Sequence, residues 1–322
     1  MKPLFLCLVC LPLWAQKDTT ALDAQAAELR ALVQHAPQLA YKKVEVQIQP
    51  PSPDFGIGYP SSVAMDNNGL IYFLQRHQEP NRPPVRGNAD PVIVVNREGK
   101  VLRSWGQGMF KIPHAIRIDP KGNIWTVDSS SSMVYEFTPM GKKLMEISVG
   151  GQPATKSGFN GTTDIAFAPN GHLFISDGYS NARILEYTAD GKRLREWGSA
   201  GTGPGQFHQP HGIAVDADGI IYVADRQNGR LQRFDLNGRY LGEWANLGMV
   251  TTVAIRNGDL WIGTQQRNEP TGAAGWLMKI DRRSGKILGY VDSAHGHHVV
   301  NVTRNGDLLS GARPDTVLWF RR

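Results

Sequence analysis

Apolar and polar residues alternate in a unit that recurs along most of the chain. Each unit has an alternating apolar strand, a turn that contains glycine, and a second apolar strand. Alternation with a period of two is typical of strands with one buried face, and glycine favours the hairpin turn because it accepts positive φ without strain. The clearest copies are HAIRIDPKGNIWTVD (114–128), TDIAFAPNGHLFISD (163–177) and HGIAVDADGIIYVAD (211–225).

Three weaker copies complete the series. They are SVAMDNNGLIYF from Ser62, TVAIRNGDLWIG from Thr252 and VVNVTRNGDLLSG from Val299. Six hairpins at intervals of about 40–50 residues match one four-stranded blade each. The pattern therefore predicts an all-β fold, a six-bladed β-propeller.

A second repeat predicts the outer strand of each blade. Its five copies are GKVLRSW (99–105), GKKLMEI (141–147), GKRLREW (191–197), GRYLGEW (238–244) and GKILGYV (285–291). The sixth hairpin has no such copy after it. The alternating segment VEVQI, residues 44–48, precedes the first hairpin, and an unpaired blade edge would expose backbone donors and acceptors. We therefore predict that this N-terminal strand completes the sixth blade and closes the ring.

The first residues have the layout of a secretory signal peptide. Lys2 is followed by an apolar run and by a small residue near residue 16, and the run is too short to span a bilayer. A lipoprotein signal is less favoured, because Leu8 and Val9 precede Cys10. We predict a signal peptide at 1–16, a linker at 17–40 with a short helix in 20–35, and the propeller at 41–322. Both cysteines, Cys7 and Cys10, lie in the signal, so the exported chain would have no thiol ligand.

Composition narrows the set of partners. The net charge is +6 and 20% of the residues are charged, without a block of like charges. This argues against a nucleic-acid-binding stripe, and no second apolar run approaches membrane-spanning length. We expect an exported (periplasmic or extracellular) monomer that binds no nucleic acid and has no membrane span.

Histidine recurs in register with the inner hairpins. We define the register position as the residue eight before the turn glycine of each hairpin. Counting from Gly122, Gly219 and Gly306 gives a histidine in blades two, four and six: His114, His211 and His298. In blades one, three and five the same count gives Ser61, Thr163 and Val250.

The alternation has a geometric consequence. Alternate blades of a six-bladed ring are related by a pseudo-threefold axis, so three imidazoles would converge at one mouth of the channel and leave a fourth metal position open. That is the arrangement of a catalytic zinc site, although imidazole also suits copper, iron and nickel. A one-residue slip would make His297 the third ligand instead of His298. His35, His77, His172 and His208 fit no pattern and are interpreted as surface or turn residues.

Longer phrases carry a family resemblance. PHGIAVD and NGRLQRF resemble repeats of the NHL type. The phrases FNGTTDIAF, FISDGYSNARILEY, GPGQFHQPHGIAVD and YVADRQNGRLQRF resemble the peptidyl-α-hydroxyglycine α-amidating lyases, from about Gly56 to the C-terminus. The resemblance implies a six-bladed propeller with zinc on three channel histidines, here His114, His211 and His298. It places the family's tyrosine on Tyr179 and its two arginines on Arg226 and Arg76.

These residues suit the reaction that the resemblance implies, in which a carbinolamide breaks at its C–N bond to give an amide and glyoxylate. Zinc would make the substrate hydroxyl more acidic, and a tyrosinate at Tyr179 would act as the base. Arg226 and Arg76 would hold the carboxylate of a small substrate or peptide C-terminus by forked hydrogen bonds. Asp177, Asn181 and Arg183 recur as Asp225, Asn228 and Arg230, which indicates repeat scaffold instead of site.

Two departures keep other functions open. The family has an aspartate after its third histidine, associated with structural calcium, where this chain has Val299, so calcium is in doubt. We also expect no copper monooxygenase domain in this chain, which leaves room for a different α-hydroxylated or carbonyl substrate. The alternatives are a non-catalytic exported NHL propeller that binds peptide or glycan and, ranked last, a calcium-dependent lactonase-like propeller.

Overall fold

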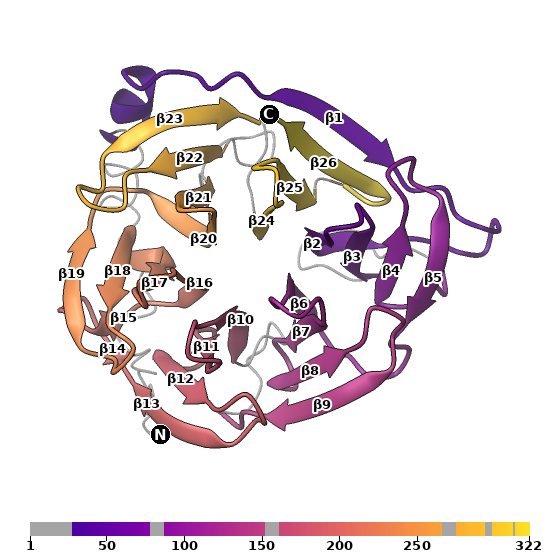
Figure 1. The fold of residues 1–322 in the computed structure, drawn as a ribbon, viewed down its shortest axis with the longest axis horizontal. Coiled ribbons are helices and arrows are strands. Elements are labelled where there is room, and N and C mark those ends of the chain that lie inside the picture. Colours follow the sequence, from indigo (N-terminus) through magenta and orange to yellow (C-terminus); the bar gives the residue numbers. More distant parts are fainter. Residues whose placement is uncertain (1–27, 78–86, 152–160, 266–274, 294–297, 312) are drawn as a thin grey trace, which may run out of the picture.

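The chain folds into a ring of six four-stranded antiparallel sheets around a central channel (Figure 1). The computed structural model describes residues 28–77, 87–151, 161–265, 275–293, 298–311 and 313–322. Within these residues five of the four-stranded sheets run outward from the channel in sequence order, and the sixth takes its outer strand from the N-terminal part of the chain. The predicted six-bladed β-propeller is confirmed.

The first three blades follow one another along the chain. Blade one contains β2 (Tyr59–Met65), β3 (Ile71–Arg76), β4 (Val92–Val95) and β5 (Val101–Trp105). Blade two contains β6 (Pro113–Ile118), β7 (Ile124–Asp128), β8 (Met133–Phe137) and β9 (Lys143–Ser148). Blade three contains β10 (Thr162–Phe167), β11 (Leu173–Asp177), β12 (Arg183–Tyr187) and β13 (Arg193–Trp197).

The remaining blades continue the ring. Blade four contains β16 (Pro210–Val215), β17 (Ile221–Asp225), β18 (Arg230–Phe234) and β19 (Tyr240–Trp244), preceded by the short parallel pair β14 (Ser199–Ala200) and β15 (Gln206–Phe207). A 3-10 turn, η2 (Arg226–Asn228), joins β17 to β18. Blade five contains β20 (Met249–Arg256), β21 (Asp259–Gln265), β22 (Trp276–Ile280) and β23 (Ile287–Asp292). Blade six contains β24 (Val300–Val302), β25 (Leu308–Gly311), β26 (Thr316–Arg321) and β1 (Lys42–Gln47).

The N-terminal strand closes the ring as predicted. β1 pairs with β26 in antiparallel register from Lys42 opposite Arg321 to Gln47 opposite Thr316. Val46 points into the apolar cluster between blades six and one, which includes Val317 and Val63. The two ends of the chain thus share one sheet, in which β1 is the outer strand and covers the edge of β26.

The outer-strand repeat joins consecutive blades. The glycine that begins one outer strand lies under the tryptophan that ends the preceding one. A Cβ on Gly238 would lie 2.8 Å from the Trp197 ring, and one on Gly285 would lie 2.3 Å from Trp244. Both glycines also have positive φ, so only glycine fits the turn and the ring contact together.

A short helix lies outside the ring. Residues 28–34 are helical, and Leu29 and Val33 are buried in the cluster between blades four and five. The signal-peptide prediction for 1–16 and the first part of the helix prediction lie outside the described residues. No helix within the described residues is long and apolar enough to cross a membrane.

The closure can be tested by shortening one side chain of β1. Val46 is 5% exposed, and we expect Val46→Ala to lower the free energy of unfolding by about 2 kcal/mol, because buried methyl groups are lost and a cavity remains. Lys43→Ala, at an exposed position of the same strand, serves as the control and should cost less than about 0.5 kcal/mol. Equal effects in urea denaturation would contradict the closure.

Candidate metal centre

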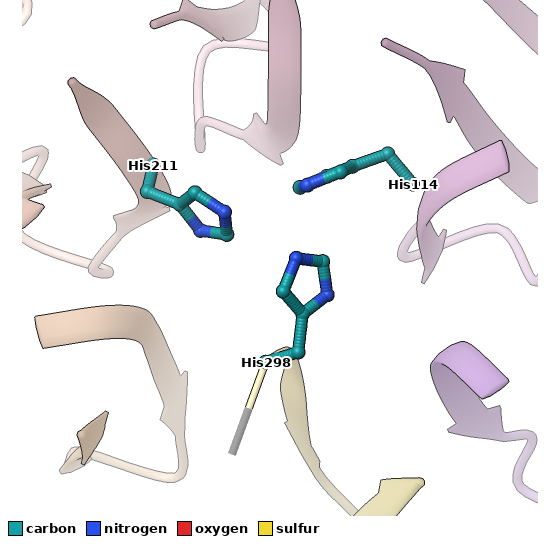
Figure 2. Close-up of side chains that lie close together, drawn as sticks. All are labelled: His114, His211 and His298. Carbon is teal, nitrogen blue, oxygen red and sulfur yellow. The ribbon is translucent and has the colours of Figure 1, made fainter. Parts of the chain in front are cut away.

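Three histidines from alternate blades meet in the channel. His114 lies in β6, His211 lies in β16, and His298 precedes β24 by two residues. Their ring centroids are 4.5, 4.9 and 5.0 Å apart, and one ligand nitrogen from each lies within 4.8 Å of the others. Figure 2 shows the rings converging from three sides. His298 is therefore the third member of the cluster, while His295 and His297 lie outside the described residues.

A β-bulge marks the register position in the inner strands. The ladder between β6 and β7 skips His114, the one between β10 and β11 skips Thr163, and the one between β2 and β3 skips Ser61. A bulged residue is left out of the ladder, so its side chain is re-aimed and its carbonyl is released. The bulge therefore turns His114 and its counterparts towards the channel mouth.

The released carbonyls hold the imidazoles. His114 Nδ1 lies 2.6 Å from the carbonyl oxygen of Thr163, in the next blade. His211 Nδ1 lies 2.6 Å from the carbonyl oxygen of Thr251, and His298 Nδ1 lies 3.0 Å from that of Ser61. A carbonyl only accepts, so each Nδ1 carries the proton and each Nε2 presents a lone pair. Blades one, three and five thus orient the histidines of blades two, four and six.

The register count is wrong by one residue in blade five. The count gives Val250, whereas the bulge and the accepting carbonyl belong to Thr251. The cause is a shorter hairpin, in which Arg256 pairs with Asp259 and only Asn257 and Gly258 form the turn. Both have positive φ, 52° and 82°, as a two-residue type I′ turn requires.

Burial keeps the imidazoles neutral. His114 and His211 are buried, and burial lowers the pKa of each well below the ordinary 6.5. The neighbouring His298 lowers both pKa values further, as do the charges of Arg76 on His114 and of Arg226 on His211. A metal binds the neutral imidazole, so the site favours the form that can act as a ligand.

Tyr179 completes the cluster. Its hydroxyl lies 2.8 Å from His114 Nε2 and 3.0 Å from His211 Nε2. The hydroxyl has one proton, which it can donate to only one of these two lone pairs. The tyrosine oxygen therefore lies beside the point on which the imidazole nitrogens converge.

Close backbone packing positions Tyr179. The amides of Gly178 and Tyr179 both donate to the carbonyl of Gly161, at 3.1 Å. A Cβ on Gly178 would lie 1.8 Å from the Pro210 carbonyl oxygen, which directly precedes His211. The glycine of the DGY phrase is thus required for the tyrosine loop to reach the strand that carries His211.

Both predicted arginines lie near the histidines. Arg76 ends β3 and is 9% exposed, and its charge lowers the pKa values of His114 and His211. Arg226 begins η2, and its guanidinium donates to Gln265 Oε1 at 3.0 Å. The amide of Arg226 donates to the carbonyl of Gln209.

Sequence reasoning missed the two glutamines that support Arg226. Gln209 directly precedes Pro210 and His211 and has φ of +69°, an uncommon conformation for a residue other than glycine. Gln265 ends β21, on the blade next to that of Arg226. The sequence shows no signal for either role, because backbone strain and contacts between blades are not readable from single phrases.

The repeat residues are scaffold, as expected. Asp177 accepts hydrogen bonds from Asn181 and Arg183, and Asp225 accepts equivalent bonds from Asn228 and Arg230. The remaining described histidines lie outside the cluster: His35, His77, His172 and His208. His172, for example, contacts Glu186 at 2.6 Å.

The donor set fits a transition metal and not calcium. Three neutral imidazoles with fixed Nδ1–H groups are the ligands that zinc and its neighbours prefer. Calcium requires six to eight oxygen ligands, whereas Val299, after His298, is a buried apolar residue. Within the described part of the chain, the three histidines are the group of metal-binding side chains that the fold brings together.

The lowered pKa values predict how the metal-free protein responds to pH. In the unfolded chain His114 and His211 take up protons as the pH falls through about 6.5. In the folded protein both stay neutral at that pH, because their pKa values are lowered. The free energy of unfolding should therefore fall below that pH, by up to about 1.4 kcal/mol per histidine per pH unit. Urea denaturation at several pH values measures this, and the His114→Leu/His211→Leu variant should show a flatter profile; identical profiles would contradict it.

Known proteins resemble this chain in sequence and in fold. The NHL repeat family model matches residues 207–234. A probable peptidyl-α-hydroxyglycine α-amidating lyase of Caenorhabditis elegans is 28% identical over 300 residues, which cover 84% of each chain. A mouse peptidyl-glycine α-amidating monooxygenase is 32% identical over 302 residues, which cover 81% of this chain and 30% of the mouse protein.

Solved structures support the fold alone. A streptogramin B lyase superposes with a TM-score of 0.57 at 17% identity, covering 87% of this chain and 97% of its own. The curated relatives and the NHL match confirm the resemblance expected from the sequence phrases. The chain is an NHL-type six-bladed β-propeller and a homologue of the peptidyl-α-hydroxyglycine α-amidating lyases.

Proposed function

We propose that the chain is an exported, zinc-dependent carbon–nitrogen lyase that cleaves peptidyl-α-hydroxyglycine-type carbinolamides to an amide and glyoxylate. The observation that carries this proposal is the contact of the Tyr179 hydroxyl with two imidazoles of the histidine cluster. The relatives named as peptidyl-α-hydroxyglycine α-amidating lyases support the same reaction class. The signal-peptide layout of residues 1–16 supports export.

His114, His211 and His298 would hold the metal through Nε2. When bound, a zinc ion would supply a Lewis acid that makes the α-hydroxyl of the substrate more acidic. The inter-blade hydrogen bonds at Nδ1 keep the three lone pairs on one point, so the protein needs little side-chain reorganisation to bind the ion.

Tyr179 would move the proton. As tyrosinate it takes the proton of the substrate hydroxyl, whose oxygen then forms the carbonyl of glyoxylate while the C–N bond breaks. The electron pair of that bond passes to the amide nitrogen, and Tyr179 returns the proton there. Atoms and charge balance without a further reactant, and the tyrosine is regenerated.

Arg76 and Arg226 would bind the substrate carboxylate. Both guanidiniums lie near enough to the cluster to lower histidine pKa values, and they come from different blades. A forked guanidinium can donate two parallel hydrogen bonds to a carboxylate, which fixes its orientation. The hydrogen bond from Arg226 to Gln265 restricts that side chain before substrate arrives.

Metal analysis tests the site. Purified protein should contain about one zinc per chain, and His114→Ala/His211→Ala should lose it, because two of three ligands are removed. His35→Ala, at an exposed residue outside the cluster, should keep the zinc. Folded wild-type protein that binds no zinc after dialysis against the metal would reject the metal centre.

Turnover tests the base. With α-hydroxyhippurate as substrate, wild-type protein should release glyoxylate, and Tyr179→Phe should lower kcat by about 10²–10⁴-fold while retaining zinc. Tyr240→Phe, whose hydroxyl contacts Glu243, is the matched control and should leave kcat unchanged. Near-normal turnover by Tyr179→Phe would exclude the tyrosine as base; no glyoxylate from zinc-loaded wild type would reject the lyase assignment.

A further inference from the structure

A second polar layer crosses the channel beyond the histidines. Arg117, in β6, is 8% exposed, and its guanidinium forms a forked pair with the Asp164 carboxylate of β10 at 2.8 and 2.5 Å. The same guanidinium donates to the carbonyl of Val300 and to Asn301 Oδ1, both at 2.8 Å and both in β24. One side chain thus connects blades two, three and six.

The partners of Arg117 extend the layer to the other blades. Asp164 accepts from the amide of Ile213 in β16, and the Asn301 amide donates to the carbonyl of Val63 in β2 at 2.6 Å. The amide of Val300 donates to Thr252 Oγ1 in β20, at 3.2 Å. All six innermost strands are therefore joined at one level by side chains.

This layer lies directly below the histidine cluster. Arg117 follows His114 by three residues, and Val300 follows His298 by two. At about 3.3 Å per residue, the two levels are roughly 7–10 Å apart along the strands. A cavity of about 200 Å³ is lined by Arg117 and Asn301 and by none of the three histidines.

The sixth blade depends most on this layer. β24 has three residues, whereas β6 and β16 have six each, and His298 lies just before it. A short strand has few ladder hydrogen bonds, and β24 pairs with β25 at three positions only. Contacts from Arg117 reach two of its three residues, Val300 and Asn301.

We propose that Arg117, with Asp164 and Asn301, is a positioning group that fixes β24 and thereby holds His298 at the distance from His114 and His211 that metal binding requires. This positioning role rests on the metal centre proposed above. The positive charge of this layer belongs to the guanidinium of Arg117. Its planar fork matches the Asp164 carboxylate and the two carbonyl acceptors of β24 in a way that a lysine ammonium does not.

Zinc affinity, measured by competition with a chromophoric chelator, tests the proposal. Arg117→Met should weaken zinc binding about 10–100-fold, as the loss of a group that orients a metal ligand does. Arg117→Lys should restore only part of the affinity, because it keeps the charge and loses the fork. Arg282→Met, which removes an arginine paired with the buried Asp216 at a distant turn, is the matched control and should change affinity by less than about twofold.

A double-mutant cycle separates positioning from general destabilisation. If Arg117 acts through His298, then His298→Ala should cost less zinc affinity in the Arg117→Met background than in the wild type. Equal costs in both backgrounds would overturn the proposal. Arg117→Met leaves the buried Asp164 carboxylate without its arginine, so this variant could fail to fold. In that case the cycle is repeated with Asn301→Ala, which keeps the Arg117–Asp164 ion pair.

Amide hydrogen exchange keeps this proposal distinguishable from the metal site. Wild-type protein that binds no zinc would reject the proposed function, yet the positioning of β24 could still be measured. Exchange at Val300 should be faster in metal-free Asn301→Ala than in metal-free Arg282→Met. Equal exchange in the two variants would overturn the role of the layer.

Discussion

The hydrogen bond between an imidazole Nδ1–H and the carbonyl of the next blade is the interaction on which the site depends. It occurs three times around the channel, at Thr163, Thr251 and Ser61. It sets the tautomer of each histidine, turns Nε2 towards the centre and joins a histidine blade to a blade without one. Three blades therefore supply the candidate metal ligands, and the three blades between them hold those histidines in position.

The bulge makes this interaction possible. The innermost strand of each blade is paired on one side only, so some of its backbone carbonyls face the channel. In β2, β6 and β10 the ladder skips one residue, and at that point the bulge re-aims a side chain and directs its carbonyl towards the neighbouring blade. Below this level the ladders are regular, and side chains such as Arg117 and Asn301 link the blades instead.

The site combines burial with polarity. The buried imidazoles have lowered pKa values and stay neutral, while Arg76 and Arg226 add positive charge beside them. Such a pocket favours anionic groups: a tyrosinate, or the carboxylate of a substrate. The burial and positive charge that lower the histidine pKa values also favour the tyrosinate form proposed for Tyr179.

Several features followed from the sequence alone, because they repeat or alternate. Local spacing along the chain predicted the six hairpins, the closing strand near residues 44–48 and the register of His114, His211 and His298. Each blade has similar strand geometry, so the same spacing recurs from blade to blade. The recurrence of Asp, Asn and Arg identified scaffold residues correctly, whereas Tyr179 was named from the family resemblance of the DGY phrase.

Other features were decided only by the tertiary structure. Thr251 replaced Val250 because a two-residue turn shortened one hairpin, which a fixed count cannot anticipate. The carbonyl partners of the histidines, the support of Arg226 by Gln265, and the layer around Arg117 all join different blades, and the contacts of His298 with Ser61 and of Arg117 with Val300 join blades that are far apart in sequence. The sequence determined which residues each blade presents to the channel, because that follows from period and turn. Which of them meet was decided by the arrangement of the blades in a ring, because that arrangement alone brings His298 of the last blade to Ser61 of the first.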